Sequence, residues 1–153
     1  METGSVTHKI IVAGIGPGNP AYLLPKAQNT IANARILVGG RRALEDFAHP
    51  AAKTCAIGAD IPGVLAFICT SLAENDVVVM VSGDPGYYSL LDALRRTFPL
   101  DQIEVIPGIS SLQLAFSRLA LPWHNARLLS FHGREPLPEE LFRAPGAVLG
   151  MLT

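Results

Sequence analysis

Three short segments combine glycines with side chains that could do chemistry. They are residues 14–18 (GIGPG), 82–88 (SGDPGYY) and 107–111 (PGISS), below called the first, second and third loops. Glycine lets a backbone approach a ligand closely, and the other residues supply a carboxylate, two phenols and two adjacent hydroxyls. Each loop follows a short apolar run and precedes an amphipathic stretch. Because parallel sheets bind ligands at strand-to-helix loops, we expect the functional site here.

The first loop resembles a dinucleotide-binding turn but departs from it. The third glycine of that fingerprint would fall where the chain has Asn19, and Pro17 removes one backbone N–H. No acidic residue follows the next predicted strand, and Arg41 and Arg42 stand there instead. NAD is therefore disfavoured, whereas NADP stays open because arginine can bind its 2′-phosphate. A phosphate-binding P-loop is excluded, and a tight turn without a ligand stays open.

The second loop holds more than helix capping requires. Asp84 followed by Pro85 is typical of a helix start, and this explains those two residues. It does not explain Gly83, Gly86 and the two tyrosines that follow. A flexible turn with a carboxylate and aromatic faces favours a ligand that carries hydroxyls, an amine and a flat ring.

The third loop is typical of a helix N-terminus, with Ser110 as the expected cap. It also resembles a nucleophile elbow, but Leu112 stands where that motif needs glycine. The four histidines are scattered, without an evident acid partner: His8, His49, His124 and His132. Hydrolase chemistry is therefore disfavoured, while the hydroxyls and backbone N–H groups of a helix start could bind a carboxylate.

The elements that must position these loops alternate along the chain. Strands are predicted at residues 9–13, 36–38, 53–57, 77–81 and 103–106, and helices at 20–34, 62–74, 87–98 and 110–119. This alternation indicates an α/β fold with a parallel sheet. Beyond residue 122, strands at 127–131 and 147–151 and a helix near 138–143 follow. We expect an N-terminal α/β domain over residues 8–121 and the start of a truncated second α/β domain over 122–153.

Composition excludes several classes of protein. The 153 residues are 49% hydrophobic and 16% charged, with a mean hydropathy of +0.33, which excludes disorder. A net charge of −1 leaves no basic excess for nucleic acid. No apolar run is long enough for a membrane span, and the polar N-terminus is unlike a signal peptide. We expect a soluble cytoplasmic protein with no metal site, in which Cys55 and Cys69 are small buried hydrophobes.

Together and in this order, the three loops resemble those of the tetrapyrrole methylases, a family that uses S-adenosylmethionine (SAM). One branch of this family methylates carbon 5 of a corrin precursor, precorrin-6Y or cobalt-precorrin-7, in cobalamin biosynthesis. The sequence is similar to that branch at residues 37–42, 103–113, 115–119, 121–123 and 132–134. The resemblance implies a parallel-sheet αβα N-terminal domain, followed by a second αβα domain that is incomplete here. SAM would lie in the cleft between the two.

The resemblance also implies the residues of the site. Contacts with SAM are expected at Pro17, Gly83, Asp84, Tyr87, Ser110 and Ser111, with a further one near Met151. The macrocycle carries carboxylates, which suit the planar guanidinium fork. Arg41 and Arg42 are therefore the expected substrate contacts, and Arg118 and Arg134 are the next candidates. The main task of such an enzyme is to align a ring carbon with the methyl group. The sequence does not identify a general base.

The implied partners are the corrin precursor, a second copy of the chain in a homodimer, and a separate or fused carbon-15 methyltransferase/decarboxylase. Two alternatives remain beside the methyltransferase. One is an NADP-binding oxidoreductase fragment, and the other is a truncated, inactive domain whose exposed half-interface drives association.

Overall fold

The computed structural model describes residues 8–131 and 148–152. The chain forms two compact units, residues 1–109 and 110–153. The sequence places a domain boundary twelve residues later, after the helix at 110–119, whereas in the structure that helix goes with the second unit. Each unit is described separately below.

A five-stranded parallel sheet forms the centre of the first unit. Its strands are β1 (Ile10–Gly14), β2 (Ile36–Gly39), β3 (Lys53–Ala56), β4 (Val77–Val81) and β5 (Ile103–Ile106), in the order β3-β2-β4-β1-β5. Every residue of β4 is buried. A strand covered on both faces needs such a continuous apolar, β-branched run, which is why the sequence predicted β4 so clearly.

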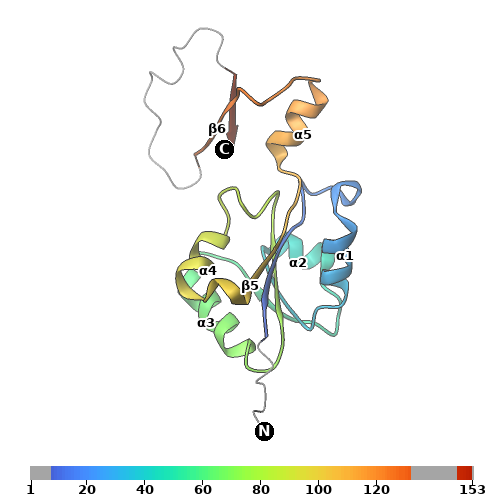
Figure 1. Cartoon of the computed structure of the whole chain (residues 1–153). Coiled ribbons are helices and arrows are strands. Elements are labelled where there is room, and N and C mark those ends of the chain that lie inside the picture. The colour runs from blue at the N-terminus through green and yellow to red at the C-terminus, as the bar shows by residue number, and fades with distance from the viewer. Residues whose placement is uncertain (1–7, 132–147, 153) are drawn as a thin grey trace. The chain divides into compact units, whose positions relative to one another are not determined.

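Helices cover both faces of this sheet (Figure 1). On one face α1 (Pro25–Ala32) and α2 (Arg41–Phe47) pack against side chains such as Leu37 and Met80. On the other, α3 (Ile61–Ser71) and α4 (Leu91–Thr97) pack against the alternate side chains of the same strands. The first unit is therefore the predicted αβα arrangement around a parallel sheet.

The first predicted helix begins later than its pattern suggested. The structure has a short 3₁₀ turn over Pro20–Tyr22, and α1 starts only at Pro25. Asn19 caps the turn, since its Oδ1 accepts the N–H of Ala21 at 2.9 Å. Proline lacks an N–H and clashes inside a helix, so Pro25 marks the true helix start.

Two further helices differ from prediction. The sequence pattern did not reveal α2, because it has seven residues, none of them buried, and no side-chain cap. The helix predicted over 87–98 is α4, which begins only at Leu91. Asp84 is therefore not its N-cap. A second 3₁₀ turn, Leu100–Gln102, precedes β5.

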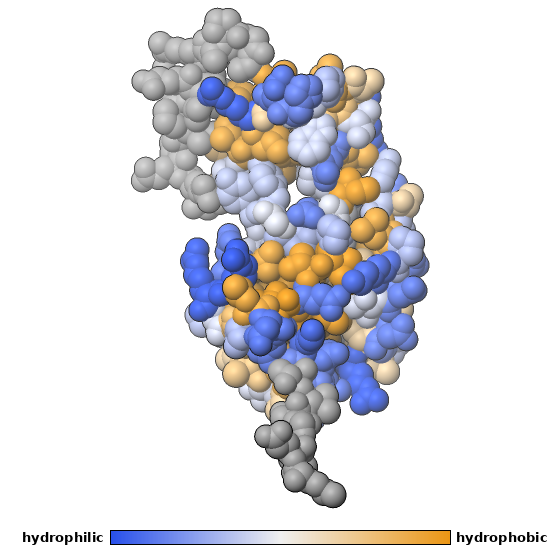
Figure 2. Space-filling model, viewed as in Figure 1, coloured by the Kyte–Doolittle hydropathy of each residue, from blue (hydrophilic) through white to orange (hydrophobic). Residues whose placement is uncertain are grey.

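The second unit contains α5 (Ser111–Arg118), β6 (Arg127–Ser130) and β7 (Leu149–Leu152). Both strands were predicted, and the structure pairs them in parallel. A Cβ on Gly150 would meet the side chains of Leu128 and Phe116. The helix predicted near 138–143 lies outside the described residues. Figure 2 shows hydrophobic residues beside hydrophilic ones on the surface of this unit, and Leu119 is 65% exposed.

The structure can be compared with three expectations from composition, which concern membrane helices, metal sites and the two cysteines. In the described ranges, no helix has the length and apolarity needed to cross a bilayer, and no cluster of three or more His, Cys, Asp or Glu side chains could hold a metal. The expected burial of the cysteines is wrong for Cys69, which is exposed on α3, and Cys55 is only partly buried. Cys69 lies on the solvent side of α3, one residue after the fully buried Ile68.

Candidate functional site

The three loops follow neighbouring strands of one sheet. The first loop follows β1, the second follows β4 and the third follows β5, and the sheet places these strands in the order β4-β1-β5. Parallel strands bring their carboxyl ends to the same edge. After β1 the chain leads to α1 on one face, and after β4 it leads to α4 on the other (Figure 1). Such a switch point is where open α/β sheets bind ligands.

One glycine from each loop allows the backbones to touch. A Cβ on Gly14 would lie 2.7 Å from the backbone nitrogen of Gly108 and 2.7 Å from the carbonyl oxygen of Gly83. A Cβ on Gly108 would overlap that same carbonyl oxygen. The close approach therefore leaves no room for any side chain at Gly14 or Gly108.

Backbone hydrogen bonds join the first and second loops. The N–H of Gly83 donates to the carbonyl of Gly16 at 2.8 Å, and the N–H of Gly16 donates back to Gly83 at 3.2 Å. Both residues have positive φ, +72° for Gly16 and +68° for Gly83, a region that favours glycine. The two loops thus form one connected turn rather than two independent ones.

Asp84 joins the second loop to the third. Its Oδ1 accepts the N–H of Gly86 at 2.8 Å, and its Oδ2 accepts the N–H of Gly108 at 3.0 Å. The sequence offered two roles for this carboxylate, a helix cap and a ligand contact. The structure contradicts the helix cap and shows a further role, a hydrogen bond between residues 24 positions apart in the chain.

Tyr87 carries an unused hydrogen-bond donor. Its hydroxyl oxygen is buried and has no hydrogen-bond partner in the part of the chain that is described. Burial raises the pKa of the Tyr87 phenol, and neighbouring Tyr88 raises it further. The two rings pack edge to face with centroids 4.8 Å apart, and Tyr88 has φ +52°. The Tyr87 phenol is therefore neutral at neutral pH, and buried groups of this kind normally have a partner.

A cavity of about 240 Å³ lies beside the first loop. It is lined by Pro17 and its neighbours, by Ser82 of the second loop, and by Arg42 and Phe47 of α2. Arg42 is exposed, and its one ion pair with another described residue is long, 3.9 Å from Nε to Oδ2 of Asp46. The structure thus brings Pro17 and Arg42 together. Arg41 does not line this cavity.

The remaining predicted contacts belong to the second unit. Ser110 caps α5: its Oγ accepts the N–H of Gln113 at 3.1 Å, and the Gln113 side chain accepts the N–H of Ser110 at 2.9 Å. Ser111 begins the helix and Met151 lies in β7, 39% exposed. Arg118 ends α5 and is exposed, while Arg134 lies outside the described residues. The capping role of Ser110 is confirmed.

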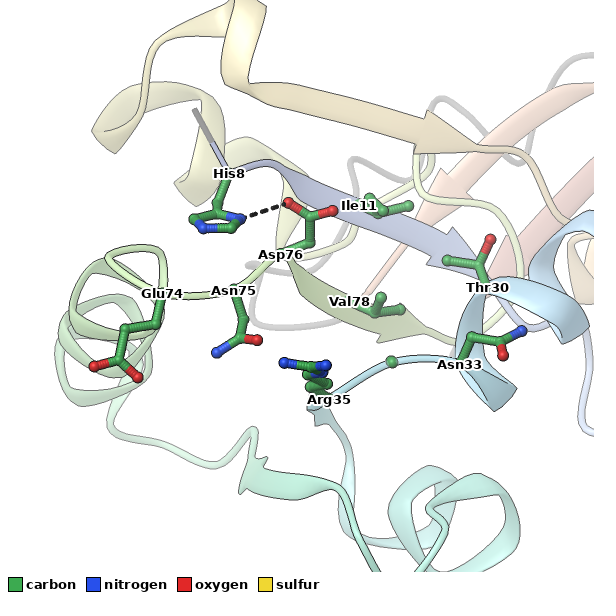
Figure 3. Close-up of a pocket in the computed structure, with 10 residues that line it drawn as sticks. His8, Ile11, Thr30, Asn33, Arg35, Glu74, Asn75, Asp76 and Val78 are labelled. Carbon is green, nitrogen blue, oxygen red and sulfur yellow. Dashed lines mark hydrogen bonds and ion pairs between the residues drawn. The ribbon is translucent and has the colours of Figure 1, made fainter. Parts of the chain in front are cut away.

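A larger cavity, of about 450 Å³, lies at the other end of the sheet (Figure 3). His8, Arg35, Glu74 and Asp76 are among its lining residues, and Nδ1 of His8 lies 3.3 Å from Oδ1 of Asp76. Asp76 precedes β4, so this cavity adjoins the amino ends of the strands. None of the residues predicted for the site lines it. Size alone therefore does not locate the site.

Comparison with known proteins identifies the family of this chain. The family model for Tetrapyrrole (Corrin/Porphyrin) Methylases matches residues 9–149. The cobalt-precorrin-7 C(5)-methyltransferase of Salmonella typhimurium is 33% identical over 125 residues, which are 82% of this chain and 62% of the relative. The precorrin-6Y C(5,15)-methyltransferase [decarboxylating] of a Sinorhizobium species is 34% identical over 161 residues, covering 99% of this chain and 37% of the relative.

A solved structure shows the same fold. The cobalamin biosynthesis precorrin-6Y methylase of Archaeoglobus fulgidus superimposes with a TM-score of 0.63 and 26% identity, over 83% of this chain and 66% of that one. The chain spans about three fifths of the length of the Salmonella relative. The resemblance seen in the three loops is confirmed by a match over most of the sequence, and the chain belongs to the tetrapyrrole (corrin/porphyrin) methylase family.

Proposed function

We propose that this chain takes part in SAM-dependent methylation of carbon 5 of a precorrin macrocycle, precorrin-6Y or cobalt-precorrin-7, in cobalamin biosynthesis. The observation that carries the proposal is the contact of three glycine loops at the carboxyl edge of β4, β1 and β5. The Salmonella relative, a cobalt-precorrin-7 C(5)-methyltransferase at 33% identity, supports the choice of carbon 5. We place the reaction in the cytoplasm.

The described residues fit SAM as the cofactor. Its sulfonium would supply an activated methyl group, so the chain itself must bind and align rather than activate. The close-packed backbones of the glycine loops and the unpartnered Tyr87 hydroxyl offer a turn and a donor for such a ligand. Proposed contacts are Pro17, Gly83, Tyr87 and the backbone around Asp84 in the first unit, and Ser110 and Ser111 in the second.

Arg42 is the stronger of the two proposed substrate contacts. It lines the cavity beside Pro17, and its long, exposed pairing with Asp46 is of the kind that contributes little. The guanidinium is therefore available for a carboxylate of the macrocycle. Arg41 lies on the same first turn of α2 and is proposed as a second contact. The cavity is smaller than the ~300 Å³ typical of a whole ligand site, so it would hold part of a ligand.

Two partners follow from the proposal. The Sinorhizobium relative is named for both carbon 5 and carbon 15. We therefore propose that a separate or fused carbon-15 methyltransferase/decarboxylase acts on the same macrocycle. A homodimer of this chain is proposed as well.

Calorimetric titration with S-adenosylhomocysteine, and with NADPH as the matched control, tests the proposal. We expect micromolar binding of S-adenosylhomocysteine and no binding of NADPH. Arg42 beside the first loop is the feature that would bind a 2′-phosphate. Binding of NADPH alone would therefore favour the oxidoreductase alternative. Binding of neither ligand would contradict a working cofactor site in this chain.

A further inference from the structure

The Gly108 N–H lies where the sheet can no longer bind it. The pairing of β1 with β5 ends at Ala13 and Ile106. Pro107 follows and has no N–H, so the ladder cannot continue through it. The next N–H in the chain is that of Gly108, and its acceptor is Oδ2 of Asp84, 3.0 Å away.

The Asp84 carboxylate also forms a hydrogen bond within its own loop, the second. Oδ1 accepts the N–H of Gly86 at 2.8 Å, which closes a turn two residues after Asp84. A carboxylate makes stronger hydrogen bonds with backbone N–H groups than a neutral acceptor does. Asp84 therefore binds the second loop internally with one oxygen and the third loop with the other.

Because the glycines are closely packed, the hydrogen bond from Gly108 to Asp84 affects the positions of all three loops. Gly108 is in contact with the Gly83 carbonyl and with Gly14, so a small shift of the third loop changes all three loops at once. The third loop also leads directly into the capped start of α5 at Ser110. A group that holds Gly108 thus sets where the chain leaves the first unit.

We propose that Asp84 is a positioning residue for the cofactor site: it holds the third loop against the second and acts on the cofactor through the loop backbones. This inference rests on the proposed function and deepens it. It differs from the expectation that the Asp84 carboxylate itself contacts the cofactor, and it rests on the two backbone N–H groups that the carboxylate oxygens accept.

The substitution Asp84→Asn tests the proposal. An amide has one acceptor atom and one donor atom, so it can no longer accept from both Gly86 and Gly108. In the ligand-free chain, amide hydrogen exchange at Gly86 or Gly108 should quicken by about tenfold or more. The Kd for S-adenosylhomocysteine should rise by a similar factor.

Asp76→Asn is the matched control. Asp76 precedes β4 as Asp84 follows it, and its Oδ1 accepts the backbone N–H of Lys9 at 2.8 Å. Asn keeps an oxygen that can accept this single N–H group, so exchange at Lys9 should quicken less than exchange at Gly86 or Gly108. The Kd should stay within about twofold of the original, since Asp76 lies at the amino end of the strand.

The outcomes separate the two proposals. A raised Kd with unchanged exchange at Gly86 and Gly108 would make Asp84 a direct ligand contact and overturn the inference. Faster exchange with an unchanged Kd would overturn it too, leaving a local structural role. If the unsubstituted chain binds no S-adenosylhomocysteine, the proposed function fails, and faster exchange then shows only that Asp84 holds the loop. If Asp84→Asn does not fold, Asp84→Glu takes its place, because it keeps the charge but displaces both acceptor oxygens. The same exchange and Kd measurements, with the same expected and contradicting outcomes, then apply to Asp84→Glu.

Discussion

At the scale of single residues, lack of space rather than flexibility explains Gly14 and Gly108. Neither has a positive φ, unlike Gly16 and Gly83. Instead, any Cβ at these positions would run into the backbone of another loop. A glycine required for close approach is a stronger sign of a built site than one required by a turn, because it implies that distant segments meet there.

Gly14→Ala should therefore destabilise the chain. The new Cβ would lie 2.7 Å from two backbone atoms that no rotamer change can move. Overpacking of this kind lowers the free energy of unfolding by about 1–3 kcal/mol. Gly58→Ala is the control, because its Cβ would meet nothing within 4 Å, and we expect a change within about 0.5 kcal/mol. Urea denaturation measures both, and equal effects would contradict the packing argument.

At the scale of elements, the start of α5 is encoded locally and α2 is not. Ser110 and Gln113 satisfy each other's backbone N–H groups in a capping box, a pattern readable in the sequence. The N-terminus of α2 has no such cap and follows Gly40 directly. Yet α2 carries Arg42 into the cavity beside the first loop.

Ser110→Ala should loosen the start of α5. Loss of an N-cap hydroxyl costs about 1 kcal/mol, or roughly fivefold in local opening. Amide exchange at Gln113, whose N–H the Ser110 hydroxyl accepts, should quicken by that factor. Ser111→Ala is the matched control, because the Ser111 side chain makes no hydrogen bond in the described part of the chain. A similar effect in both variants would argue against capping as the cause.

At the scale of the whole molecule, the two units differ in how much core their described residues form. In the first, a five-stranded sheet carries helices on both faces, and β4 is buried along its length. In the second, the described strands are one parallel pair beside α5. A two-stranded sheet is at best marginally stable without further packing.

Native-state hydrogen exchange of the full chain should therefore show unequal protection. Amides of β4 should exchange only through global unfolding, whereas those of β6 and β7 should exchange through smaller openings. Mass spectrometry of peptic fragments measures this difference. Equal protection of β4 and β6 would show that the chain unfolds as one cooperative body.

The sequence by itself determined the class of fold, the positions of the strands, the Ser110 cap and the three loops. Each of these depends on local features of the sequence, namely hydrophobic periodicity, turn residues and capping pairs. It did not reveal that β4, β1 and β5 are neighbours, since strand order depends on which faces bury each other. For the same reason only the tertiary structure brought Asp84 to the N–H of Gly108, and Arg42 to the cavity at Pro17. Those contacts join segments far apart in the chain, and the packed sheet alone decides them.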